Sequence, residues 1–141
     1  MVNIQRPSPR DDDLSRLRVS PQAVNGIESL RSEQVAVLRF TDRSLDFRIS
    51  DTVKVALSDA ITSACETGAR GVVLDLARVR MIDSCGISLI IISHNKSSSL
   101  NAKFALANVS PFIDKILEIM RLKKHLAIFP SVPEAVESLC D

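Results

Sequence analysis

The stretch of sequence that decides the fold is residues 72–87, which read VVLDLARVRMIDSCGI. It begins, after Gly71, with a short and mostly apolar run, which is typical of a strand covered on both faces of a sheet. Residues 84–97 then predict a helix that is apolar around much of its circumference and is therefore largely buried. Between the two, the pentapeptide IDSCG at residues 82–86 predicts a loop that ends at a helix N-cap on Ser84.

The start of this helix is suited to contact with another protein. An N-cap serine leaves its hydroxyl at the end of the helix, where unpaired backbone N–H groups and the helix dipole favour an added anion. Gly86 lies in the first helical turn and has no side chain, so a partner's backbone or a kinase active site could approach closely. A capping role alone is the simpler interpretation of Ser84, and the two roles are compatible.

The segments before this stretch predict a hairpin and a helix. Residues 23–30 are expected to form a short edge strand, and the alternating pattern of Val35–Phe40 predicts a second strand paired antiparallel with it. Ser50 or Asp51 can cap a helix with one apolar face, and Gly68 supplies its end. The exposed edge of the hairpin could pair with a second copy in a homodimer.

The segments after it continue the alternation of strands and helices. Lys103–Ala107 predicts a strand, Ser110 followed by proline begins a third helix, and residues 126–129 predict a last short strand. Ser131 and Glu134 form a capping box at the start of the terminal helix. The third helix carries these apolar residues at helical spacing: Phe112, Ile113, Ile116, Ile119 and Met120.

This order of elements predicts an α/β fold. We expect a mixed β-sheet with an N-terminal antiparallel hairpin, parallel central strands and about four helices. Binding sites in such folds gather at the carboxyl ends of the strands, so the segment between Leu76 and the second helix matters most. Residues 1–20, which contain three consecutive Asp, are expected to be a flexible tail, and residues 21–141 one domain.

Composition excludes several classes of function. The net charge of +1 and the absence of Trp and Tyr give no support for a nucleic-acid partner. The longest strongly apolar run falls far short of the roughly 20 residues that span a bilayer, so no membrane partner is expected. The three cysteines lack metal-ligand spacing, which argues against a metal site and fits a reducing cytoplasm. No phosphate-binding glycine loop appears, and no cofactor is expected.

The pattern Asp-Leu-x5-Ile-Asp-Ser-x-Gly that begins at Asp75 resembles the STAS domain of bacterial anti-sigma factor antagonists. The resemblance covers roughly residues 35–139, and the family's phosphorylated serine maps onto Ser84. The family's second serine is Cys85 here. The family's Gly-x-Leu-Asp after the second strand is matched only in Leu45 and Asp46, because the glycine is absent.

This resemblance implies a protein that binds an anti-sigma factor. The partner is also a serine kinase that binds ATP, phosphorylates Ser84 and thereby releases the antagonist, and a serine phosphatase is the implied third component. The implied contact residues are Asp46, Asp83, Ser84, Cys85 and Gly86. Asp83 is expected to orient the Ser84 loop, with a plain capping role as the alternative, and Asp46 could be a partner contact or only a residue at the helix entry.

Other interpretations of these residues are weaker. Cys85 at a helix N-terminus could be a redox sensor, but a small buried residue is the simpler interpretation. His94 lies ten residues after Ser84, about 15 Å along the helix, so it cannot serve Ser84 as a catalytic base. An enzyme is therefore the class we expect least. A STAS scaffold or adaptor in a signalling or transport assembly, with Ser84 never modified, is the main alternative function.

Overall fold

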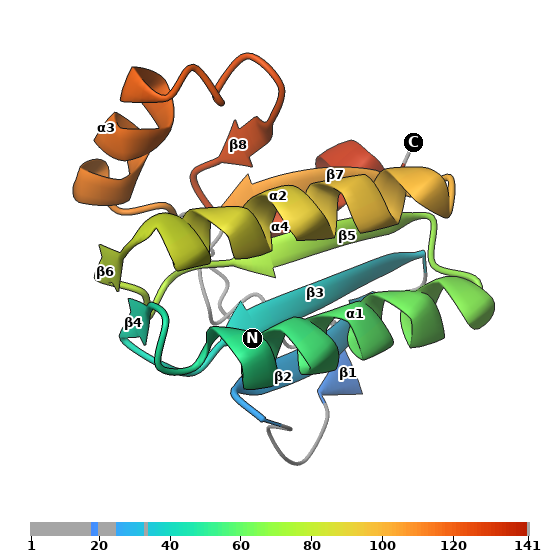
Figure 1. The fold of residues 1–141 in the computed structure, drawn as a ribbon. Helices are drawn as coiled ribbons and strands as arrows, with labels where there is room; N and C mark the ends of the chain where they lie inside the picture. The colour runs from blue at the N-terminus through green and yellow to red at the C-terminus, as the bar shows by residue number, and fades with distance from the viewer. Residues whose placement is uncertain (1–17, 20–24, 33, 141) are drawn as a thin grey trace, which may run out of the picture.

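The computed structural model describes residues 18–19, 25–32 and 34–140, and its main sheet has six strands in the order β1-β2-β3-β5-β7-β8 (Figure 1). The first three strands are antiparallel and the others are parallel, which confirms the predicted mixed sheet. The strands are β1 (Arg18–Val19), β2 (Ile27–Ser32), β3 (Val35–Phe40), β5 (Gly71–Asp75), β7 (Lys103–Ala107) and β8 (Ala127–Phe129).

Helices cover both faces of this sheet. Figure 1 shows α1 and α2 side by side on one face, α4 behind the sheet, and α3 beyond the end of β7. The helices are α1 (Ser50–Glu66), α2 (Ser84–Ser99), α3 (Pro111–Ile119) and α4 (Val132–Leu139). No helix in the part of the chain that the structure describes is long and apolar enough to cross a membrane.

Strand β3 shows how the alternating pattern builds two apolar cores. Val35 and Val37 belong to the core under α4, whereas Leu38 and Phe40 belong to the core under α1, α2 and α3. Because both faces of the sheet are covered, residues of both sets are buried, as the apolar central strands require. The central strand β5 is buried along its whole length, as its sequence predicts.

The structure contains three strands that the sequence analysis did not predict. Strands β4 (Ser44–Leu45) and β6 (Met81–Ile82) pair in parallel to form a separate small sheet. Strand β1 lies at the end of the segment expected to be a flexible tail and pairs with β2, so β2 is not the edge strand that we expected. Residues 1–17 and 20, the rest of that tail, lie outside the described residues.

The start of α1 differs from expectation. Helix α1 has Ile49 at its N-cap and no side-chain cap, so Ser50 and Asp51 lie in its first turn instead of capping it. On the other hand, Ser110 and Ser131 cap α3 and α4 as predicted, each accepting a hydrogen bond from a backbone N–H in the first turn.

The end of α1 follows the prediction. Gly68 has a φ of +102°, a left-handed conformation that suits glycine. The N–H of Ala69 donates to the carbonyl of Ala64, and that of Gly68 to the carbonyl of Cys65. Together these bonds form a Schellman motif, which satisfies carbonyl groups in the last turn of the helix.

Candidate functional site

The small β4–β6 sheet brings the two predicted parts of the site together at the start of α2. Leu45 is paired with Ile82 in this sheet, so Asp46 and Asp83 are the residues that follow the last pair of its parallel strands. The backbone N–H of Asp83 donates to the carbonyl of Leu45 at 3.2 Å, and that of Phe47 donates to the Asp83 carboxylate at 3.1 Å. The loop after β4 is therefore bound directly to the loop before α2.

The N-cap of α2 is Asp83 and not Ser84, which corrects the sequence prediction. One oxygen of the Asp83 carboxylate accepts hydrogen bonds from the backbone N–H groups of Cys85 at 2.9 Å and Gly86 at 3.1 Å. A carboxylate at this position also interacts favourably with the helix dipole. Because its second oxygen accepts a hydrogen bond from the backbone N–H of Phe47, Asp83 both caps the helix and holds the neighbouring loop.

Ser84 is the first residue of α2, and it is exposed to solvent. Its neighbours Asp83 and Cys85 are half-buried. Because Asp83 occupies the N–H groups of the first turn, the Ser84 hydroxyl is not needed as a helix cap. An exposed serine with no capping task can be approached from solvent without loss of the helix.

Gly86 has a different role from the one the sequence suggested. It is buried, and a Cβ atom placed on it would overlap the Leu45 carbonyl oxygen and the Ile82 side chain and would lie 2.9 Å from the Cβ of Leu45. The missing side chain thus allows α2 to pack closely on the β4–β6 sheet. Gly86 faces its own chain instead of leaving space for a partner.

Asp46 forms an ion pair with Arg48 in its own loop. The closest atoms are Asp46 Oδ2 and Arg48 Nη2, 2.9 Å apart, and the backbone N–H of Arg48 donates to Asp46 Oδ1 at 3.0 Å. The side-chain hydrogen bond from Arg48 lowers the pKa of Asp46, which outweighs the opposing effect of its partial desolvation. Asp46 is therefore anionic at neutral pH, and two carboxylates lie on the loops that flank Ser84.

Asp75 is a buried residue whose role sequence analysis missed. Its carboxylate accepts hydrogen bonds from Arg39 Nε at 2.8 Å, Asn108 Nδ2 at 3.0 Å and the backbone N–H of Ala77 at 3.0 Å. These contacts join the carboxyl ends of β3 and β5 to the residue after β7. The signal was an aspartate inside the apolar run of a buried strand, where an ionised side chain requires a partner.

The remaining candidates do not form a second site. The ring of His94 lies against Phe104, with ring centroids 5.5 Å apart. The three cysteines are free thiols, and the burial of Cys65 raises its pKa. No group of three or more metal-binding side chains occurs among the residues that the structure describes.

Comparisons with known proteins agree with this architecture. The family model of the STAS domain matches residues 27–135. No curated protein matches the sequence. The similar structures described below are 17–21% identical to the chain, so each likeness concerns the fold alone.

Three of these structures illustrate the range of proteins that share the fold. An anti-sigma factor antagonist (STAS) domain protein from Planctomyces limnophilus is 21% identical, with a TM-score of 0.69 over 80% of this chain and 96% of its own. The anti-sigma factor antagonist SpoIIAA in its unphosphorylated form is 17% identical, with a TM-score of 0.65 over 81% and 96%. A sulfate transporter family protein from Wolinella succinogenes is 17% identical, with a TM-score of 0.63 over 76% and 85%.

Proposed function

The chain belongs to the STAS domain family, and from this premise we propose that it is an anti-sigma factor antagonist controlled by phosphorylation of Ser84. In this proposal the unphosphorylated chain binds an anti-sigma factor that is also a serine kinase. The kinase, with ATP bound to itself, phosphorylates Ser84 and releases the antagonist, and a serine phosphatase restores the binding form.

The exposed position of Ser84 at the start of α2 is the observation that carries this proposal. Ser84 is exposed, it follows a strand and loop that match the family pattern, and its hydroxyl has no capping task to lose. Among the similar structures, SpoIIAA is described in an unphosphorylated form, which supports a phosphorylation switch as a property to test in this chain.

The local charges explain how one phosphate could end binding. A phosphate adds about −1.5 to −2 charges at neutral pH. Interaction with the helix dipole offsets this by only about 0.3–1 kcal/mol, and Asp83 already occupies two N–H groups of the first turn. At an interface that fits a neutral hydroxyl, the new charge lies near Asp46 and Asp83 and must lose water, which costs several kcal/mol. Since about 1.4 kcal/mol corresponds to a tenfold change in affinity, binding is lost without a change of fold.

Intact-mass measurement tests this proposal. The full chain is incubated with ATP and the cognate kinase, and we expect one added phosphate, located at Ser84 by fragmentation. The Ser84→Ala variant serves as the control and should gain no mass. Phosphorylation at a different residue, or none with a kinase that binds the chain, would contradict the proposed switch.

A scaffold or adaptor role is the second candidate function. The observation that favours it is the likeness to the sulfate transporter family protein, which shows that the same fold occurs in a different setting. In that case the chain would bind its partner equally well whether or not Ser84 carried a phosphate. A comparison of partner affinity between the phosphorylated and unphosphorylated chain therefore separates the two candidates.

A further inference from the structure

Two large apolar side chains are exposed near Ser84, one on the loop after β4 and one on β6. Phe47 follows β4 and is 71% exposed, which is the highest value among the large apolar side chains of the described residues. Met81 begins β6 and is 55% exposed. The backbone bond from Phe47 to Asp83 keeps the first of them close to the start of α2. Exposed apolar residues that gather near one site are typical of a surface that binds another protein.

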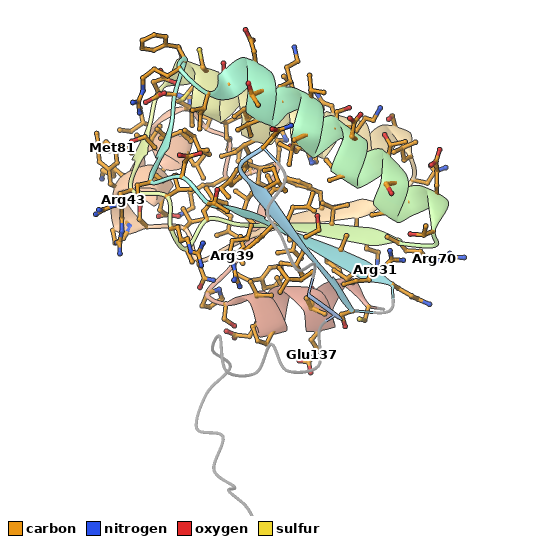
Figure 2. All side chains as sticks on the ribbon, turned by 90° about the horizontal axis from the view of Figure 1, so that it is seen from below. Arg31, Arg39, Arg43, Arg70, Met81 and Glu137 are labelled. Carbon is orange, nitrogen blue, oxygen red and sulfur yellow. The ribbon has the colours of Figure 1, made fainter. Side chains whose placement is uncertain are left out.

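Arginines lie beside these apolar residues. The backbone N–H groups of Arg80 and Met81 both donate to the carbonyl of Arg43, at 2.7 and 3.1 Å, so these residues are neighbours in the β4–β6 sheet. Arg43 and Arg80 are exposed, and within residues 25–32 and 34–140 neither forms an ion pair. Figure 2 shows Arg43 and Met81 at one end of the molecule and Arg31 and Arg70 toward the opposite end.

Charged residues lie at both ends of the small β4–β6 sheet. Because β4 and β6 are parallel, Arg43 and Arg80 both precede the paired residues, and Asp46 and Asp83 both follow them. Arg43 and Arg80 thus lie at one end of the short sheet and Asp46 and Asp83 at the other, where Arg48 pairs with Asp46. Asp42, also exposed, lies next to Arg43. This mixture of charges is poorly suited to a uniform polyanion and fits a protein partner with charges of both signs.

The dimensions place these residues within one interface. Arg80 lies four residues before Ser84, so the two Cα atoms are at most about 14 Å apart. A standard protein interface covers about 800 Å² on each partner, which corresponds to a disc of roughly 16 Å radius. A standard interface centred on Ser84 is therefore wide enough to include Arg80 and the rest of the small sheet.

We propose that Arg43, Phe47, Arg80 and Met81, together called the β4–β6 surface, determine which partner the chain binds. The partner is a protein that offers an apolar recess for Phe47 and Met81 and carboxylates for the two arginines. This inference rests on the proposed function, in which that partner is the kinase. It explains where specificity can reside when Ser84 itself offers a partner only a hydroxyl.

The test uses the full chain with Ser84→Ala, which cannot be phosphorylated at position 84. This chain captures its partner from a lysate of the source organism, and the captured protein is identified, purified and titrated by calorimetry. We expect Phe47→Ala and the double variant Arg43→Glu/Arg80→Glu each to weaken binding at least tenfold. The matched controls are Leu100→Ala, at the far end of α2, and Arg70→Glu, and each should change affinity less than twofold.

The outcomes separate the surface from the switch. Equal affinities of the Phe47, arginine and control variants would overturn the β4–β6 surface, and so would failure of the chain to retain any protein. If the captured protein does not phosphorylate Ser84 of the unsubstituted chain, the proposed kinase switch fails. The affinities of the variants for the captured protein still test the β4–β6 surface in that case. The proposal holds only if the Phe47 and arginine variants lose binding and the control variants do not. Circular dichroism of each variant tests whether it is folded, and Phe47→Ala should leave the fold intact because Phe47 is exposed.

Discussion

At the scale of single residues, Asp83 and Ser84 have different roles, and this difference determines what the site can do. Asp83 caps α2 and binds the loop at Phe47, so the hydroxyl of its neighbour has no part in holding the fold. The adjacent Asp-Ser pair made the cap ambiguous from sequence, because either side chain can accept N–H bonds in a first turn. The structure resolves the ambiguity in favour of the carboxylate.

The cap assignment predicts unequal effects on stability. Asp83→Ala should lower the free energy of unfolding by about 1–2 kcal/mol, because the N–H groups of Cys85, Gly86 and Phe47 lose their acceptor. Ser84→Ala should change it by less than about 0.5 kcal/mol, as expected for an exposed residue. Urea unfolding followed by circular dichroism measures both. Asp83→Asn, which keeps an acceptor oxygen, should recover most of the loss, and a larger cost for Ser84→Ala than for Asp83→Ala would refute the assignment.

Substitutions at Ser84 should act on binding instead. Ser84→Ala keeps the site neutral and should bind the partner constitutively, whereas Ser84→Asp places a third carboxylate near Asp46 and Asp83 and should bind at least tenfold more weakly. Calorimetric titration with the purified kinase measures both affinities. Equal affinity of the two variants would count against the electrostatic mechanism.

The Asp46–Arg48 pair predicts a dependence on pH. Because the pKa of Asp46 is lowered in the folded chain, its contribution to stability is present above the pKa of the unfolded chain. It is lost as the pH falls through the lower pKa of the folded chain. NMR titration of the Asp46 carboxyl should give a pKa below the usual 3.8, and Arg48→Ala should return it toward that value. A pKa unchanged by Arg48→Ala would show that the pair does not persist in solution.

At the scale of elements, the contact between α2 and the β4–β6 sheet holds the site in place. Gly86 permits this contact because Leu45 and Ile82 fill the space of its missing side chain. We expect Gly86→Ala to destabilise the chain by about 1–3 kcal/mol, since the Leu45 carbonyl is backbone and cannot move aside as a side chain can. Thermal unfolding measures the loss. Ser88→Ala, an exposed position on the same helix, is the control and should have little effect.

The elements that were predicted well are those with a long repeating pattern or a definite cap. Lys103–Ala107 has the predicted bounds, and α3 and α4 begin where Ser110 and Ser131 indicated. Strands β4 and β6 were missed because two residues are too few to show a period. In α3 the apolar spacing could not tell which face is covered. Ile113 and Leu117 are buried, whereas Phe112 and Ile119 on the neighbouring face are exposed.

At the scale of the whole molecule, the carboxyl edge of the main sheet is organised around one buried charge. Asp75 is fully buried at the end of the central strand and is bonded to Arg39 and Asn108, which belong to segments far apart in the sequence. The family pattern begins at this aspartate, yet the sequence could not show its partners, because they meet only after the sheet has formed. The site at the start of α2 is built on this edge.

The Asp75 contacts predict a large effect on global stability. Asp75→Ala removes the partner of Arg39 at 2.8 Å and the acceptor of Asn108, and it should cost about 3–5 kcal/mol, as expected when one member of a buried ion pair is deleted. Glu28 is the matched control, because it lies farther from Arg39, at 3.4 Å, and is more exposed. Glu28→Gln should therefore cost less than about 1 kcal/mol. Urea unfolding of the two variants measures the difference, and similar losses would mean that the buried Asp75 carboxylate contributes no more to stability than the more exposed Glu28.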